Sequence, residues 1–247
     1  MKKQLLTLVT LILFSLIAIS AASPALAAEE ISDPGMEMDS EMQGATVDVA
    51  DPIEPFNRAM FQFNDKLYFW FLKPVSRGYG AVVPEPGRRG VKNFFRNLLA
   101  PVRFANSLLQ GKAESAGLEF SRFVINSTVG VLGFGDPAKD AIGKTPDAED
   151  LGQTLGTYGI GNGFYVVWPV FGPSTLRDTF GLVGDSFLDP VAYLDPWEAR
   201  LGVRAYDTVN DASLVIGEYE AFKDAAIEPY ASMRDAYIQN REKRIKE

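Results

Sequence analysis

Apolar residues recur along the chain at the spacing of an α-helix. Between residues 88 and 100 they stand at positions i, i+3, i+4, i+7 and i+8, which are Val91, Phe94, Phe95, Leu98 and Leu99. This spacing puts them on one helical face, while the basic residues between them fall largely off that stripe. Pro101 ends the helix, and a short continuation through Leu109 stops at Gly111. We therefore predict an amphipathic helix over 88–100.

The same spacing predicts helices farther along the chain. They cover 113–128, 175–188, 196–226 with a break near Asp211, and 229–246. The apolar face of the first consists of Ala116, Phe120, Phe123 and Val124. That of the second consists of Leu176, Phe180, Val183 and Phe187.

Acid–proline pairs mark places where helices are expected to begin. An acidic side chain accepts hydrogen bonds from the free N–H groups of a first turn, and proline has no N–H to leave unpaired there. Such pairs stand at Asp51-Pro52, Asp136-Pro137, Asp189-Pro190, Asp195-Pro196 and Glu228-Pro229. Together with the periodicity they predict an all-α fold built from amphipathic helices.

One region departs from the helical pattern. Residues 151–172 are rich in glycine and contain a β-type apolar run, 164–167, before Trp168-Pro169. We predict a glycine-rich loop or a short hairpin here. The glycine spacing does not match a dinucleotide-binding fingerprint, which also needs a strand before it and a helix after it.

The helix expected from Asp51 to Leu72 ends in consecutive aromatic residues. They are Tyr68, Phe69, Trp70 and Phe71, and Lys73-Pro74 follows them. Amphipathic rings beside a cation are typical of a membrane interface, so these four are candidate interface residues. A well-buried core helix is the alternative.

The N-terminal residues predict export. Lys2 and Lys3 precede an apolar run over 5–22, and Ala25-Leu26-Ala27 offers a cleavage site, so we expect 1–27 to be a signal peptide. An uncleaved inner-membrane anchor is the alternative. Residues 28–50 are acidic and poor in apolar residues, which predicts a disordered leader. Its three methionines suggest copper(I) only weakly. Residues 51–247 are then one helical domain.

Charge and composition narrow the function. Cleavage would remove two lysines and no acids, lowering the formal net charge from −8 to −10. An acidic protein gains nothing from phosphate counterion release, so nucleic acid is excluded as a partner, and membrane association would have to rest on apolar contact.

The chain has no cysteine and no histidine, which excludes disulfides, histidine-based catalysis and histidine-based zinc sites. Asp147, Glu149 and Asp150 are better explained as a solvated acidic turn than as a calcium site. We therefore predict no enzyme activity, no metal and no cofactor.

Five stretches, in order, carry a family resemblance. They are 51–64 (DPIEPFNRAMFQFN), 83–111 (VPEPGRRGVKNFFRNLLAPVRFANSLLQG), 122–138 (RFVINSTVGVLGFGDPA), 149–178 (EDLGQTLGTYGIGNGFYVVWPVFGPSTLRD) and 228–241 (EPYASMRDAYIQNR). They cover most of residues 51–241. The combination resembles the MlaA/VacJ family of outer-membrane phospholipid-transport proteins.

The resemblance implies a ring-like bundle of helices, seated in the inner leaflet of the outer membrane, with an amphipathic central channel. Family members associate with trimeric porins. They pass phospholipids mislocalised in the outer leaflet to a soluble periplasmic carrier, which maintains lipid asymmetry.

Within these motifs, neutral polar and apolar residues are candidates for a lipid path. They are Asn57, Phe61, Asn64, Asn93, Phe94, Asn97, Gln153, Gly156 and Tyr165. The basic helix 88–100 is expected to meet lipid phosphates, or else to present a solvated basic face. Arg122, Arg177 and Asp178 are candidates for structural ion pairs or for headgroup contacts.

One feature differs from the family pattern. Family members begin with a lipoprotein signal and a lipidated cysteine, whereas this chain reads Leu26-Ala27-Ala28-Glu29 at that place. Attachment is then expected to rest on the surface of the ring at the periplasmic face of the outer membrane. A partly periplasmic protein, a soluble carrier of a hydrophobic ligand, is the alternative.

Overall fold

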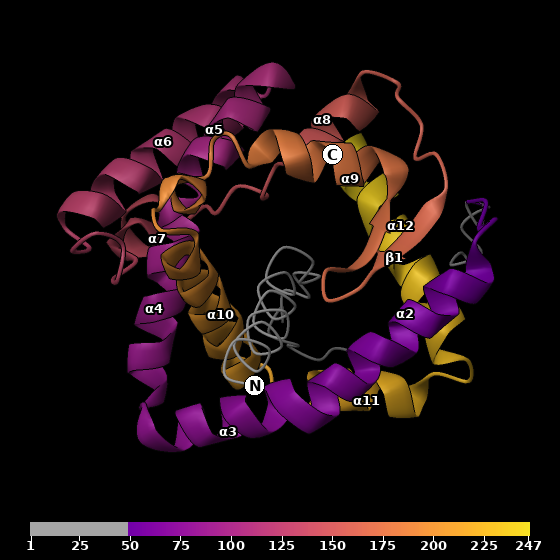
Figure 1. Ribbon diagram of the computed structural model, residues 1–247. Helices are drawn as coiled ribbons and strands as arrows, with labels where there is room; N and C mark the ends of the chain where they lie inside the picture. Colours follow the sequence, from indigo (N-terminus) through magenta and orange to yellow (C-terminus); the bar gives the residue numbers. More distant parts are fainter. Residues whose placement is uncertain (1–48) are drawn as a thin grey trace, which may run out of the picture.

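The helices follow one another around a ring (Figure 1). The structure is a computed structural model that describes residues 49–247. The predicted signal peptide and almost all of the acidic leader lie outside the described residues. Within 49–247 the chain is mainly helical, which confirms the all-α prediction. No helix in this range is long and apolar enough to cross a membrane.

The opening helix runs past its aromatic end. It consists of α2 (Glu54–Leu67), a π-helical turn η2 (Tyr68–Leu72) and α3 (Lys73–Val82). Pro74 does not end it, because the wider π-type turn before it accommodates a residue without an N–H. The expected cap at Asp51 is wrong. Ile53 precedes α2, and the Asp51 carboxylate instead accepts hydrogen bonds from the side chains of Asn57 and Tyr230.

The next helices agree with their predicted spacing. They are α4 (Glu85–Leu98), α5 (Ala100–Leu109), α6 (Ala113–Thr128) and α7 (Pro137–Ile142). The chain turns after α5 at Gly111, where a φ of 74° favours glycine, as predicted. The pair before α7 acts differently from the prediction, because the Asp136 carboxylate makes no cap and binds Arg122 instead.

The glycine-rich region contains both a helix and a hairpin. Helix α8 (Leu151–Thr157) was not predicted, whereas strands β1 (Tyr165–Trp168) and β2 (Gly172–Thr175) form the expected antiparallel hairpin, with Tyr165 opposite Thr175. Helix α9 (Leu176–Asp185) follows directly. A Cβ on Gly181 would lie 2.4 Å from the Gly152 nitrogen, so these glycines permit α8 and α9 to pack backbone against backbone.

The last third of the chain closes the ring. It contains a 3₁₀ turn η3 (Pro190–Tyr193), α10 (Trp197–Leu214), α11 (Glu218–Ala225) and α12 (Pro229–Lys246). The break between α10 and α11 falls at Gly217, with a φ of 104°, rather than near Asp211. Asp195 does not cap α10, but Glu228 caps α12 as predicted by accepting from the Ala231 N–H at 2.8 Å.

An apolar cluster joins the two ends of the ring. Its buried members come from β1 and α12, and they are Tyr165, Val167, Tyr230 and Ile238. Val49 packs against this cluster, so the ordered packing begins two residues before the predicted start at 51. Figure 1 shows α2 and α12 meeting beside β1 on this side of the ring.

Candidate functional site

Two helices, α6 and α9, bury their polar side and expose their apolar side. The buried residues of α9 include Arg177 and Asp178, whereas Phe180 and Val183 on its predicted apolar face are 64% and 57% exposed. On α6, Glu119, Arg122 and Asn126 are buried. The apolar Phe120 and Val124 of α6 are exposed, and so is Phe187 just after α9. The periodicity located the two helices and their apolar faces, but it did not indicate which face is buried.

The polar side of α9 is buried because its charges are paired within the ring. Asp178 accepts hydrogen bonds from Arg241 at 2.8 and 3.0 Å and from Tyr237 at 2.8 Å. Arg241 also binds Asp150, and Arg177 lies 3.1 Å from Asp178. Burial alone would raise the pKa of Asp178, but the charges of Arg241 and Arg177 outweigh it and hold the pKa below its ordinary value.

Two asparagines predicted for a lipid path bind the hairpin instead of standing free. Asn57 is fully buried, donates to the Tyr165 carbonyl at 3.0 Å and accepts from the Val167 N–H at 2.8 Å. Asn64 repeats the arrangement two turns later with the Trp168 carbonyl and the Val170 N–H, at 3.0 and 2.6 Å. Both amides therefore fasten α2 to β1 and its turn.

The other candidates on this side of the ring are also packed. Gln153 is fully buried and donates to the Ala148 carbonyl at 3.1 Å, and Tyr165 is part of the apolar cluster. Gly156 lies against α12, where an added Cβ would come within 2.6 Å of Ile245. The Phe61 ring meets the edge of Tyr230. Whether any of these residues lines a lipid path stays a prediction.

The remaining path candidates hold the segment between α6 and α7. Asn97 donates to Ser127 at 2.9 Å, and Phe94 stacks on Phe134 with ring centroids 5.0 Å apart. Asn93 donates to the Phe134 carbonyl. The segment carries two exposed apolar residues, Val131 and Leu132, at positive φ, a conformation that costs free energy in such side chains.

The four aromatic residues predicted for a membrane interface differ in how exposed they are. Tyr68 donates to Glu220 at 2.9 Å, and the ammonium groups of Lys73 and Lys223 lie 5.1 and 5.0 Å from the centroid of the Phe69 ring. Phe71 is half-buried, and Trp70 is 77% exposed. The rings therefore differ in availability, and Trp70 is the one that a membrane surface would meet most fully.

The predicted solvated acidic turn is wrong for two of its three residues. Glu149 is buried and binds Lys112 at 2.7 Å, while Asp150 caps α8 through the Gln153 N–H and binds Arg241. Only Asp147 is exposed. Within residues 49–247 no group of three or more acidic residues is placed to hold a metal ion.

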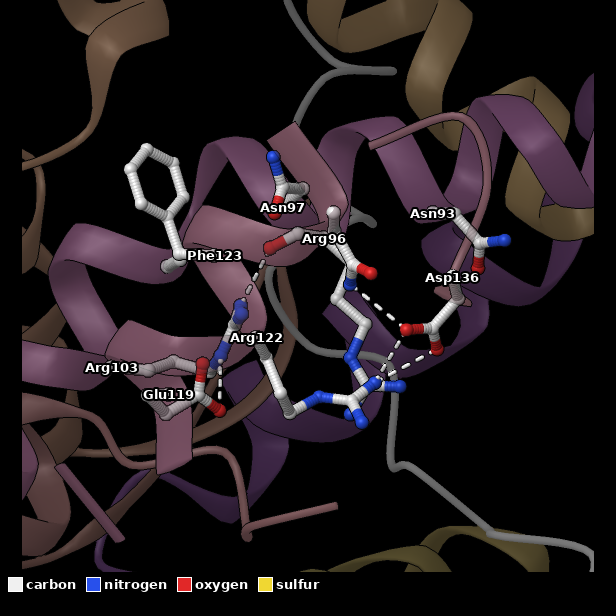
Figure 2. A pocket seen from close by; sticks show the side chains of 10 residues that line it. Asn93, Arg96, Asn97, Arg103, Glu119, Arg122, Phe123 and Asp136 are labelled. Atoms are coloured by element: carbon white, nitrogen blue, oxygen red, sulfur yellow. Dashed lines mark hydrogen bonds and ion pairs between the residues drawn. The ribbon is translucent and has the colours of Figure 1, made fainter. Parts of the chain in front are cut away.

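A polar pocket lies where α4, α5, α6 and the residue before α7 meet (Figure 2). Its charged lining consists of Arg96, Arg103, Glu119, Arg122 and Asp136. Its neutral lining consists of Asn93, Asn97, Ala100, Phe123 and Asn126. The cavity measures about 20 Å³, enough for one water molecule or one ligand oxygen.

Most charges of the pocket are paired. Arg122 binds both oxygens of Asp136 at 2.8 Å, and Arg103 binds Glu119 at 3.0 Å. Sequence reasoning selected Arg122, Asn93 and Asn97 and noted Arg96 only as part of a basic helix. It assigned Asp136 to the start of a helix and missed Arg103 and Glu119, because only the packing of the three helices brings these side chains together.

Comparison with known proteins agrees with this architecture. The family model described as MlaA lipoprotein matches residues 49–244. The Intermembrane phospholipid transport system lipoprotein MlaA of Escherichia coli (strain K12) is 34% identical over 193 residues, which cover 77% of this chain and 76% of that protein. The protein of the same name from Haemophilus influenzae is 34% identical over 205 residues, covering 77% of each chain.

A solved structure is similar to this chain in both sequence and fold. It is described as "Structural basis for maintenance of bacterial outer membrane lipid asymmetry", shares 32% identity, superposes with a TM-score of 0.67, and covers 79% of this chain and 99% of its own. Named relatives are components of a transport system, which supports the prediction that the protein is not an enzyme. The chain belongs to the MlaA lipoprotein family.

Proposed function

We propose that this protein moves phospholipids, without catalysis, at the periplasmic face of the outer membrane. It takes phospholipids mislocalised in the outer leaflet and passes them toward a soluble periplasmic carrier. The observation that carries this proposal is the reversed polarity of α6 and α9, whose charged residues are buried while Phe120, Phe180 and Phe187 are exposed. Such a surface is unfavourable in water and favourable against lipid chains.

The relatives support the lipid as cargo. Their names describe an intermembrane phospholipid transport system, and the similar solved structure is described in terms of outer membrane lipid asymmetry. Helices that bury charged residues and expose apolar ones suit this role, since the apolar residues can contact lipid chains while polar groups accept a headgroup. A trimeric porin and a soluble carrier are the partners we propose on the basis of the family resemblance.

Vesicle flotation of the purified full chain tests the proposal. Neutral phosphatidylcholine vesicles are used because the acidic chain would be repelled by anionic ones. We expect the wild type to float and Phe180→Ser to lower partitioning at least about tenfold, because a large apolar side chain contributes about 1.5–3 kcal/mol when it is buried in an apolar phase. Phe180 is mainly exposed, so its replacement leaves the fold intact.

The matched control is Ile227→Ser. Ile227 is fully exposed between α11 and α12, away from the reversed helices, and its loss is expected to leave flotation unchanged. Equal losses in both variants, or no flotation of the wild type, would contradict membrane seating. If the wild type instead stays in the soluble fraction with one bound phospholipid, the protein is a soluble lipid carrier.

A further inference from the structure

Arg96 is the unmatched charge of the polar pocket. Its side chain makes no hydrogen bond or ion pair with the described residues, although its own carbonyl accepts a hydrogen bond from Arg103 at 2.8 Å. The lining holds three arginines and two carboxylates, Glu119 and Asp136. Because the two carboxylates already bind Arg103 and Arg122, the pocket carries one positive charge in excess.

The neighbouring groups act on the charge of Arg96. Partial burial lowers the pKa of the Arg96 guanidinium, and the positive charges of Arg103 and Arg122 lower it further. Arg96 as a whole is nevertheless exposed, so a ligand can reach its side chain from solvent. In Figure 2 its side chain extends into the space between α4 and α6, toward Arg122 and Asp136. The charge is therefore reachable, and no carboxylate among the described residues pairs with it.

Helix α6 carries an apolar surface that begins at the pocket and leads away from it. At about 100° per residue, Glu119, Arg122 and Asn126 share one face of the helix, while Phe120 and Val124 share a face centred about 150° away. Phe123 falls between the two faces and lines the pocket. Phe120 and Val124 are exposed. A ligand bound at Arg96 can thus place an anionic oxygen in the pocket and an apolar chain along α6.

From this geometry we propose that the pocket at Arg96 is a binding site for a singly charged phosphate ester, with the phosphodiester of a phospholipid as its ligand. Arg96 makes the direct contact with the phosphate oxygen, and Arg103 and Arg122 contribute positive charge from behind. The cavity volume admits one oxygen, so the rest of the headgroup stays at the mouth. The choice of a lipid over free phosphate rests on the proposed function.

Isothermal titration calorimetry of the full chain tests the site. The probes are dihexanoylphosphatidylcholine below its micellar concentration, inorganic phosphate, and a monoacylglycerol that has an apolar chain but no phosphate. We expect Arg96→Gln to weaken binding of the phospholipid at least about tenfold, as for loss of a charge-assisted hydrogen bond, and to leave the monoacylglycerol unaffected.

Arg89→Gln is the matched control. It makes the same change of charge on the same helix, but Arg89 is exposed, lies outside the pocket and pairs with Glu85. Its phospholipid affinity is expected to equal that of the wild type. Circular dichroism of both variants verifies that the helices are retained.

The outcomes separate the site from the proposed function. Equal phospholipid binding by the wild type and Arg96→Gln would overturn the site and leave the proposed function standing. Binding of inorganic phosphate as tight as that of the phospholipid, and dependent on Arg96, would support the anion site but assign free phosphate as its ligand. A wild type that binds neither phosphate nor phospholipid would overturn both.

Discussion

Helices α9 and α6 both bury charged residues and expose apolar ones, but they differ in how the buried charges are paired. Each turns charged residues inward, yet around α9 every arginine has a carboxylate partner, since Arg177 and Arg241 face Asp178 and Asp150, and the remaining carboxyl group, Asp185, is held by the Leu151 N–H and Asn106. Around α6 three arginines face two carboxylates. A balanced buried network fixes geometry, whereas an unbalanced one retains affinity for a missing partner. The charged residues around α9 therefore stabilise the ring, and a ligand is expected at those around α6.

The neutral polar groups also differ from one another. On the α9 side, Asn57 and Asn64 use their amides on the backbone of the hairpin, and Asn57 is fully buried. On the α6 side, Asn97 and Asn126 are also buried and bind Ser127 and Asp136, whereas Asn93 makes a single long contact of 3.4 Å. Polar residues in the family motifs are thus not equivalent, and their burial decides whether they hold structure or stay available.

Removing Arg241 is expected to cause the greatest loss of stability. The Arg241→Ala variant would leave the buried Asp178 carboxylate with only Arg177 and Tyr237, so we expect the free energy of unfolding to fall by about 3–5 kcal/mol in urea denaturation. Lys243→Ala on the same helix is the control, because Lys243 is mainly exposed and its loss should cost less than about 0.5 kcal/mol. A similar, small effect of both substitutions would mean that the network does not hold the ring.

The two asparagines of α2 are expected to differ in the same assay. The Asn57→Ala variant leaves a buried carbonyl and a buried N–H of β1 unpaired and should lower the free energy of unfolding by about 2–3 kcal/mol. Asn64→Ala should cost less, about 1–2 kcal/mol, because water can replace the amide at the exposed Trp168 carbonyl, although the N–H of buried Val170 is left unpaired. Equal costs would show that burial does not separate the two contacts.

Asp185 is expected to make the stability of the fold depend on pH. Burial raises its pKa to about 6, although hydrogen bonds from the Leu151 N–H and Asn106 oppose this. A carboxyl group whose pKa is higher in the folded than in the unfolded state stabilises the fold when protonated, and this contribution is lost as the pH rises from about 4 to about 6.

We therefore expect a carboxyl signal with a midpoint near 6 in an NMR titration, absent from the Asp185→Asn variant. The stability of this variant relative to the wild type should rise between pH 4 and 6 and then stay level. A midpoint near 4 would contradict the burial effect.

The sequence predicts helix positions better than it predicts which face is buried. Helix α6 has the bounds that its periodicity indicates, and α12 agrees with its acid–proline start. The reversed polarity is invisible to periodicity, because a stripe of Phe180 and Val183 has the same spacing whether it meets a core or a membrane. Helix α8 was missed because Gly152 and Gly156 suggest a loop, while in the fold they permit close packing.

The pocket was only partly predictable for a related reason. Arg122 belongs to a family motif and the basic character of α4 is evident, so two of the three arginines were noticed. Arg103 and Glu119 are 16 residues apart on different helices, and their contact depends on how α5 packs against α6. No local sequence pattern predicts that one of the three arginines has no carboxylate paired with it.

The unbalanced charge around α6 predicts a small gain of stability when it is removed. Replacing Arg96 with Gln relieves repulsion by Arg103 and Arg122 and removes no ion pair among the described residues, so we expect the free energy of unfolding to rise, by no more than about 1 kcal/mol, since part of the side chain is hydrated. Arg89→Gln should show no gain. With short-chain phospholipid present the order should reverse, because a ligand that binds the folded wild type more tightly stabilises it more. A loss of stability in the ligand-free Arg96→Gln variant would mean that Arg96 stabilises the fold and is not reserved for binding an anion.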